Sequence, residues 1–247
     1  MASFRRHDGR RANELRPVSF TLDYVPTAEG SCLVQMGGTR VICTACVLQG
    51  VPEWLEGAGR GWVTAEYGML PASTAKRKRR PWGRPDGRSA EIQRLIGRVL
   101  RAVVAMDALG ERTIYLDCDV LTADGGTRTA AINGAYVALA QAAASGALPR
   151  RAIARPVAAV SVGLVAGRAV LDLDYAEDSA AQVDLNVAMT AGGKYLEIQG
   201  TGEAAAFDDA QLQAMLRLAR SGIRRIITAQ RRVMRELKTS APQGKPQ

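Results

Sequence analysis

The chain has 247 residues and a mass of 26.3 kDa, and 47% of its residues are hydrophobic, which is enough to bury one sizeable core. No apolar run reaches the roughly 18 residues that cross a bilayer, and residues 1–6 lack the apolar stretch of a secretory signal. The excess of 33 Lys and Arg over 24 Asp and Glu gives a net charge of +9, which favours a polyanionic partner such as nucleic acid or an acidic membrane surface. Asp8 and Glu14 argue against a mitochondrial presequence, so we expect a cytoplasmic protein.

The part of the chain before Lys76 has the pattern of β-strands. Short runs rich in Val, Thr, Tyr and Leu are separated by Gly and Pro, which is typical of strands joined by turns. The predicted strands are Ser19–Tyr24, Ser31–Met36, Arg40–Leu48 and Trp62–Met69. Gly37-Gly38 between two of these runs indicates a hairpin turn, and we expect this half to form an antiparallel sheet.

The hydrophobic period changes after Ser89. Apolar residues recur at three- and four-residue steps from Ile92 to Val104, with arginines on the other side, which predicts an amphipathic helix that ends near Gly110. A strand is then predicted over Thr113–Leu121, and an alanine-rich helix over Thr129–Ala144.

The second half repeats this plan of strands followed by helices, without clear sequence similarity to the first. Two paired hairpins are predicted, with the strands Val157–Val165, Val170–Tyr175, Val183–Met189 and Tyr195–Gln199. Asp208 or Asp209 can cap a helix through Leu218, Gly222 fits a helix break, and Ile223–Leu237 can form a last helix. Residues 239–247 are polar and are expected to be disordered. This order of elements favours one α+β domain.

The four cysteines do not predict a metal site. Cys43 and Cys46 have the C-x-x-C spacing, but this pair lies in an apolar run and no second such pair exists. His7 is the single histidine of the sequence, so a tetrahedral zinc site lacks ligands. We therefore interpret the cysteines as small thiols buried in strands; they are Cys32, Cys43, Cys46 and Cys118.

One segment carries nearly all of the net charge. Between Lys76 and Arg101, ten basic residues stand against two acidic ones, which gives +8. The densest part, from Lys76 to Arg84, is consistent with a phosphate-tracking surface, a subunit contact or a disordered basic loop. Charge alone does not choose among these three.

The segment from Asp117 to Thr129 is the most informative. A strand leads into Gly125-Gly126, where a helix begins, so the free N–H groups of its first turn and the fork of Arg128 both favour an oxyanion such as phosphate. The alternative is a tight turn that Thr127 or Asp124 merely caps. Gly-Gly-Thr-Arg also occurs at residues 37–40, but there it joins two strands, and we give that copy no phosphate role.

Arg88 and two aspartates are candidates for the remaining chemistry. Arg88 starts the predicted amphipathic helix, where it is either an ordinary exposed residue or a second guanidinium for the same phosphate. Asp184 alternates with apolar residues of its strand, which places its carboxylate opposite the core, and Asp178 lies in the preceding loop. Such a pair can hold Mg²⁺, or one member can protonate a leaving oxygen, whereas a solvated acidic loop is the alternative.

At these residues the sequence resembles ribonuclease PH, the family of phosphate-dependent 3′ exoribonucleases related to polynucleotide phosphorylase and to the ring subunits of exosomes. The resemblance covers nearly the whole chain. It is carried by Arg6–Arg10, Glu14–Pro17, Gly61–Tyr67, Gly87-Arg88 with Glu91–Arg98, Asp117–Thr129, Leu171–Tyr175 with Glu177-Asp178, and Gln199–Thr201 with Glu203.

The resemblance implies one catalytic domain over residues 1–238 with the family's βαβα fold, related to a ribosomal-protein domain, in which helices pack on two mixed sheets. It also implies a homo-hexamer built as a trimer of dimers. Phosphate would be bound by Arg88, Gly126, Thr127 and Arg128; catalysis and metal binding would fall to Asp178 and Asp184; RNA would be bound by Arg77, Arg79 and Arg80.

The reaction implied by the resemblance is phosphorolysis of the RNA 3′ end. Inorganic phosphate, with Mg²⁺ (or Mn²⁺), releases the terminal nucleotide as a nucleoside 5′-diphosphate, and the substrate implied is the 3′ extension of precursor tRNA. Pro81-Trp82-Gly83-Arg84-Pro85 departs from the family's pattern, so the individual roles in the basic loop stay open. The alternatives are a non-catalytic RNA-binding ring subunit and a hydrolytic exonuclease.

Overall fold

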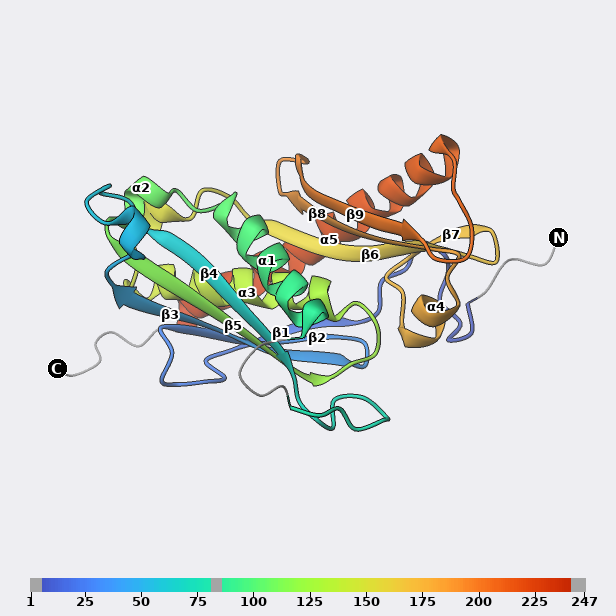
Figure 1. Ribbon diagram of the computed structural model, residues 1–247, viewed down its shortest axis with the longest axis horizontal. Helices are drawn as coiled ribbons and strands as arrows, with labels where there is room; N and C mark the ends of the chain where they lie inside the picture. Colours follow the sequence, from blue (N-terminus) through green and yellow to red (C-terminus); the bar gives the residue numbers. More distant parts are fainter. Residues whose placement is uncertain (1–5, 81–85, 241–247) are drawn as a thin grey trace.

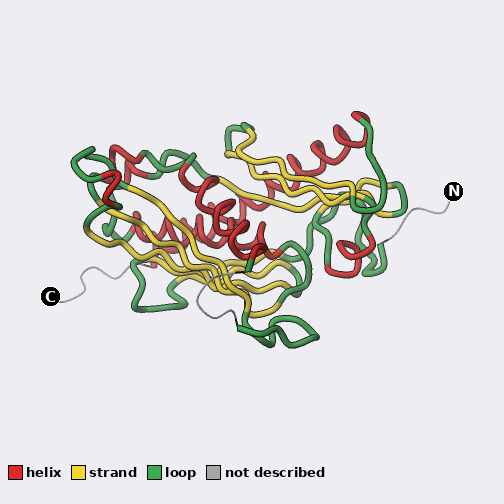
Figure 2. The backbone as a smooth tube through the Cα atoms, in the orientation of Figure 1, coloured by secondary structure: helices red, strands yellow, loops and turns green. Residues whose placement is uncertain are grey.

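The computed structural model describes residues 6–80 and 86–240, which form nine strands and five α-helices (Figure 1). The strands gather in two sheets with helices packed on them, as Figure 2 shows. This arrangement confirms the predicted α+β class. Two short 3₁₀ helices, η1 (Glu53–Leu55) and η2 (Arg150–Ala152), lie in connections. In the described part of the chain, we find no helix with the length and apolarity that crossing a membrane requires.

The first sheet has five strands in the order β1-β2-β3-β5-β4. They are β1 (Val18–Leu22), β2 (Gly30–Met36), β3 (Thr39–Gln49), β4 (Trp62–Met69) and β5 (Arg112–Thr122). Neighbours are antiparallel except β4 and β5, which are parallel. This sheet is therefore mixed, as the resemblance implies, and the expected antiparallel arrangement holds for β1, β2 and β3 but not for β4. The reason is the helical crossover between β4 and β5, because such a connection brings the chain back in the same direction.

That crossover contains two helices where the sequence predicts one. α1 (Gly87–Arg101) ends well before Gly110, and the short α2 (Met106–Leu109) follows. Between them Val104 pairs with Ile153 in an isolated β-bridge, which draws the chain out of the helix. Val103 and Val104 are nevertheless buried. The apolar pattern therefore predicts correctly that they belong to the core, although they lie beyond the end of α1.

Helix α3 (Thr127–Ala144) packs against strands of both sheets and is buried on nearly every side. Gly134 allows its close approach to the first sheet, since a Cβ there would lie 2.6 Å from the Cys43 sulfur. Cys43, Cys32 and Cys118 are buried thiols, as predicted, whereas Cys46 is half-buried. None of the four is in a disulfide in the described structure, which includes all of them.

The second sheet has the order β7-β6-β8-β9, with β6 (Val157–Val165), β7 (Arg168–Leu171), β8 (Val183–Thr190) and β9 (Tyr195–Gly202). All neighbours are antiparallel, because tight turns join β6 to β7 and β8 to β9, so the prediction of a mixed sheet is wrong here. β7 also ends earlier than predicted. The buried Asp172 has φ +56°, which takes the chain out of the strand and towards the short helix α4 (Tyr175–Ala180).

The C-terminal segment is one long helix, α5 (Asp209–Ser240), so the predicted break at Gly222 is wrong. Gly222 instead lets α5 lie close to β7, because a Cβ there would be 2.8 Å from the Leu171 side chain. The backbone of α5 includes residues 239 and 240, so the expectation of disorder is wrong for these two residues. Residues 241–247 lie outside the described structure.

Candidate functional site

A cavity of about 690 Å³ lies where the N-terminal ends of α1 and α3 meet α4 and the segment that follows β4. Its lining includes the predicted site residues Arg88, Gly126, Thr127 and Asp178, together with Arg77. These residues come from four separate parts of the sequence. Folding therefore brings together most of the side chains that the sequence singled out.

The N-terminus of α3 is open towards a ligand. Gly125 and Gly126 have φ values of +72° and +63°, which only glycine adopts readily, and no side chain caps the helix. The capping alternative for Thr127 and Asp124 is therefore not realised. The Thr127 hydroxyl accepts a hydrogen bond of 2.8 Å from the Tyr67 hydroxyl. Uncapped amides at the positive end of a helix dipole favour an anion.

The other copy of Gly-Gly-Thr-Arg forms the β2–β3 hairpin, as predicted, with Met36 opposite Thr39. The structure adds a role that the sequence does not reveal. The Thr39 hydroxyl donates a 2.6 Å hydrogen bond to the Gly125 carbonyl and accepts one of 2.9 Å from the Asp124 N–H. The hairpin copy thus supports the loop that leads into α3.

Arg128 belongs to a network of polar side chains that joins α1 to the second sheet. Its Nη1 donates a 2.9 Å hydrogen bond to the Gln199 Oε1 and lies 3.8 Å from the Glu91 Oε1. Gln199 in turn donates to Glu91. Sequence reasoning named Gln199 and Glu91 only as parts of the resemblance, because no local spacing links α1, α3 and β9. Arg128 does not line the cavity, but its charge reaches both aspartates, as their pKa shifts show.

Arg88 lies in the first turn of α1, which begins where the Asp86 carboxylate accepts a 2.7 Å hydrogen bond from the Ser89 N–H. The Arg88 side chain is exposed, lines the cavity and forms no ion pair with any described residue. Its positive charge counteracts the rise in the pKa of Asp178 that burial causes. Arg88 is therefore a guanidinium available to an anionic ligand.

Asp178 and Asp184 interact electrostatically across α4 and β8. Burial raises the pKa of Asp184 to about 6, and the nearby Asp178 carboxylate adds to the rise while Arg128 opposes it. The Asp184 Oδ2 accepts a 3.1 Å hydrogen bond from the Asn186 amide. Asn186 is buried, so the face of β8 that the sequence placed opposite the core is covered, and the reason is that α1 and α3 pack over it.

The donor set at these aspartates fits a hard divalent cation. The Asp184 Oδ1 is buried and has no hydrogen-bond partner in the described structure. An unpaired carboxylate oxygen beside a second carboxylate is the kind of ligand that Mg²⁺ or Mn²⁺ prefers. The residues present therefore fit the ion that the resemblance implies.

Comparison with known proteins identifies the family of this chain. Residues 14–145 match domain 1 of the 3′ exoribonuclease family, also called the ribonuclease PH family, and residues 155–222 match its domain 2. The chain belongs to this family. Solved structures of similar fold include Rrp46 from rice (Oryza sativa), with 19% identity, a TM-score of 0.77 and coverage of 93% of this chain and 100% of that one.

A second similar structure is the Archaeoglobus fulgidus exosome with RNA bound to the active site. Its matching chain is 22% identical, with a TM-score of 0.79 and coverage of 91% of this chain and 92% of that one. At these identities the likeness shows a common fold. The ribonuclease PH fold thus extends over the described domain.

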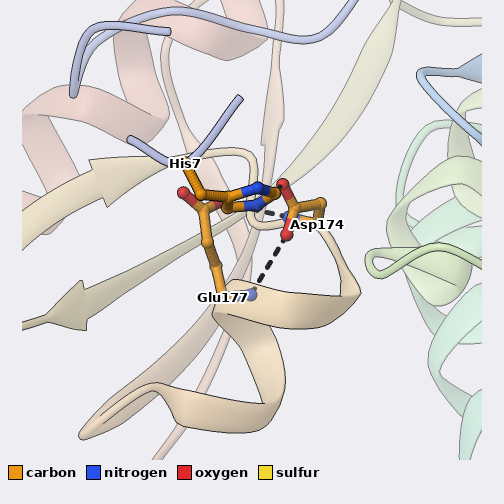
Figure 3. Close-up of side chains that lie close together, drawn as sticks. All are labelled: His7, Asp174 and Glu177. Atoms are coloured by element: carbon orange, nitrogen blue, oxygen red, sulfur yellow. Dashed lines mark hydrogen bonds and ion pairs between the residues drawn. The ribbon is translucent and has the colours of Figure 1, made fainter. Parts of the chain in front are cut away.

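In this ribonuclease PH family member, a second group of side chains has the spacing of a metal site (Figure 3). His7, Asp174 and Glu177 lie together, with the His7 Nε2 2.8 Å from the Asp174 Oδ2. Both carboxylates already have cationic partners, because the Arg10 Nη2 lies 3.3 Å from Asp174 and 3.5 Å from Glu177. We therefore assign this group to the structure of α4 rather than to a metal.

The basic run divides between the cavity and the outer surface. Lys76, Arg77 and Lys78 line the cavity, whereas Arg79 and Arg80 are exposed and are not among its lining residues. The structure thus brings the first of the three predicted RNA-binding arginines to the site and leaves the other two on the surface beyond it. The atypical Pro81–Pro85 segment lies outside the described residues.

Proposed function

We propose that this ribonuclease PH family member is a phosphorolytic 3′-to-5′ exoribonuclease that releases nucleoside 5′-diphosphates from RNA. One observation carries the proposal: the uncapped N-terminus of α3 opens into the same cavity as Arg88 and Asp178. A hydrolytic exonuclease needs carboxylates but no pocket for inorganic phosphate beside them. An inert ring subunit needs neither the carboxylates nor the phosphate pocket.

Inorganic phosphate would bind at the start of α3. The amides of its first turn and the helix dipole attract the anion. Arg88 from the cavity wall, and Arg128 by the charge that also reaches Asp178, would offset the charge of the anion. Holding the phosphate in this way turns a mobile solute into a positioned nucleophile. Gly125 lets this loop pass close to the second half of the chain, because a Cβ there would lie 2.6 Å from the Leu173 carbonyl oxygen.

In the reaction, a phosphate oxygen attacks the phosphorus of the terminal 3′–5′ linkage, and the bond from phosphorus to the 3′-oxygen breaks. The shortened RNA keeps a 3′-hydroxyl, whose proton comes from Asp178 or Asp184. The pKa of Asp184, raised to about 6, is closer to neutral pH than that of an ordinary carboxyl, which favours a role in proton transfer. Because a phosphoanhydride is formed as the ester is broken, the reaction is reversible.

Asp178 and Asp184 would also hold Mg²⁺ (or Mn²⁺). When bound, the ion supplies Lewis-acid stabilisation of the charge that develops on the phosphate oxygens. The exposed basic residues that follow β4 would attract the RNA backbone. We further propose that the substrate is the 3′ extension of precursor tRNA and that the protein acts as a homo-hexamer, a trimer of dimers; the exosome of similar fold with RNA in its active site supports an RNA substrate.

One assay tests the proposal against both alternatives. A 3′-extended RNA is incubated with the protein and Mg²⁺, with and without phosphate, and the products are identified by chromatography. Nucleoside diphosphates that form only with phosphate support phosphorolysis. Monophosphates would indicate hydrolysis, and RNA that is bound but remains intact would indicate a binding subunit.

A further inference from the structure

Tyr175 is an exposed aromatic ring at the border of the proposed active site. Its exposed fraction is 64%, so most of the residue is accessible to a ligand. It lines the 690 Å³ cavity and also a neighbouring cavity of about 410 Å³, whose lining includes His7 and Arg16. Tyr175 therefore borders two cavities, one of which is also lined by Arg88, Thr127 and Asp178.

The backbone beneath this ring is firmly held. Tyr175 is the first residue of α4, whose N-cap Asp174 forms a reciprocal capping box with Glu177. The Tyr175 N–H donates a 3.3 Å hydrogen bond to the Asp124 Oδ1, which ties α4 to the loop before α3. Asp178 follows three residues later, so it lies on the same helix face as Tyr175.

We infer that Tyr175 stacks on a base of the RNA 3′ end, next to the linkage that is cleaved. This inference rests on the proposed function and adds a nucleotide-positioning residue to it. Arg88 and Asp178 mark the space for the reacting phosphates, and the adjoining cavity offers room for a neighbouring nucleoside. The flat ring of Tyr175, at the border of the two cavities, offers a surface on which a base of any identity can stack. Contacts to phosphate alone do not offer such a surface.

The first test compares RNA binding of Tyr175→Ala and Tyr175→Phe in phosphate-free buffer, with a short single-stranded RNA and fluorescence anisotropy. Loss of one stacked base should weaken binding of the alanine variant by about 5- to 100-fold. The phenylalanine variant keeps the ring and should bind like the wild type. Tyr24→Ala is the matched control, since Tyr24 is also exposed but lies beside Asp23, which contacts Gln141 near the far end of α3.

The second test removes the base instead of the ring. An RNA with abasic residues at its 3′ end should bind the wild type more weakly than the intact RNA, whereas Tyr175→Ala should not discriminate between the two. Equal affinity of the alanine variant and the wild type for intact RNA would overturn the inference, as would a phenylalanine variant as weak as the alanine variant.

Kinetics separate this inference from the proposed function. If stacking is correct, Tyr175→Ala raises the KM for RNA and leaves the KM for phosphate unchanged. A wild type that makes no diphosphates would refute phosphorolysis, while the binding tests, which need no turnover, would still decide on stacking. Phosphorolysis by the wild type with an unchanged KM for RNA in Tyr175→Ala would refute stacking alone.

Discussion

Two clusters of arginines and carboxylates flank helix α4 and differ in how their charges are satisfied. The paired cluster comprises Arg6, Arg10, Arg16, Asp172, Asp174 and Glu177, and its members form ion pairs with one another. The open cluster comprises Arg88, Arg128, Asp178 and Asp184, whose carboxylates form no ion pair in the part of the chain that the structure describes. The same residue types thus hold the fold together in one place and remain available to a ligand in the other.

The difference has an energetic meaning. In the paired cluster, Arg16 binds the fully buried Asp172 through its Nε at 3.0 Å and its Nη2 at 2.7 Å, so each buried charge has a counter-charge. In the open cluster, burial and, after it, the nearby Asp178 carboxylate raise the pKa of Asp184, so ionising Asp184 costs stability. Substitutions in the paired cluster should therefore destabilise the fold, and substitutions in the open cluster should lower the activity.

The largest effect is expected from Asp172→Asn. This change removes the closest counter-charge of the buried Arg16, which keeps only the more distant Asp124 at 3.9 Å, and should lower the free energy of unfolding by about 3 kcal/mol. Chemical denaturation measures the loss. Glu197→Gln removes a partner from the exposed Arg98 pair and should change stability by less than about 1 kcal/mol. Similar losses in the two variants would show that the paired cluster has no special structural role.

Arg128→Ala should affect activity instead of stability. Loss of one preorganised donor to the reacting phosphate should lower kcat/KM for phosphorolysis by about 10²- to 10³-fold. RNA affinity should change little, and loss of the hydrogen bond to Gln199 should lower the free energy of unfolding by only about 1 kcal/mol. Arg40→Ala is the matched control, because Arg40 ends the other Gly-Gly-Thr-Arg copy, is exposed and belongs to the hairpin. An equal loss of activity in both variants would contradict the assignment of the phosphate site.

Asp184→Asn should stabilise the protein in EDTA at pH 7. The folded-state pKa of Asp184 lies above the ordinary value of 3.8, at about 6, so the folded state binds this proton more tightly than the unfolded chain. The stabilisation that this proton gives to the folded state is at most about 3 kcal/mol. It is fully present below about pH 4 and is lost as the pH rises through about 6.

Thermal melting between pH 4 and 7 measures this difference. The wild type should lose stability across this window relative to Asp184→Asn, and added Mg²⁺ should stabilise the wild type more than the variant. Identical pH profiles of the two proteins would mean that burial does not raise the pKa of Asp184. Equal stabilisation of the two proteins by Mg²⁺ would mean that Asp184 is not a metal ligand.

The smallest effect is expected from neutralising the basic run, which belongs to neither cluster. Replacing Arg77, Arg79 and Arg80 by alanine should reduce the dependence of RNA binding on salt, lowering the slope of log K against log[salt] by about 2. The KM for phosphate should stay unchanged. A large rise in that KM would mean that these arginines bind inorganic phosphate and do not only attract RNA.

Much of the site could be predicted from the sequence because its signals are local. A strand, two glycines and a helix start occur within Asp117–Thr129, and the structure shows the uncapped helix that this order predicts. The two Gly-Gly-Thr-Arg copies could be told apart because their flanking residues differ. The support that Thr39 gives to Gly125 could not be foreseen, since 86 positions separate the two residues.

The acidic segment after β7 shows where sequence reasoning fails. Asp172, Asp174, Glu177 and Asp178 lie within seven positions and look alike as a sequence. Arg6, Arg10 and Arg16 of the N-terminal segment pair with the first three, whereas Asp178 forms no ion pair with a residue that the structure describes. No property of the acidic segment itself specifies which carboxylate a distant arginine reaches.

By itself, the sequence determined the strands, most helices, the α+β class and the candidate residues of the site, because turn chemistry and hydrophobic period act between near neighbours. The tertiary structure alone decided that β4 and β5 are parallel, that α5 continues through Gly222, and which charges are paired. These outcomes depend on packing and desolvation between segments far apart in the chain, and such interactions exist only once the chain has folded.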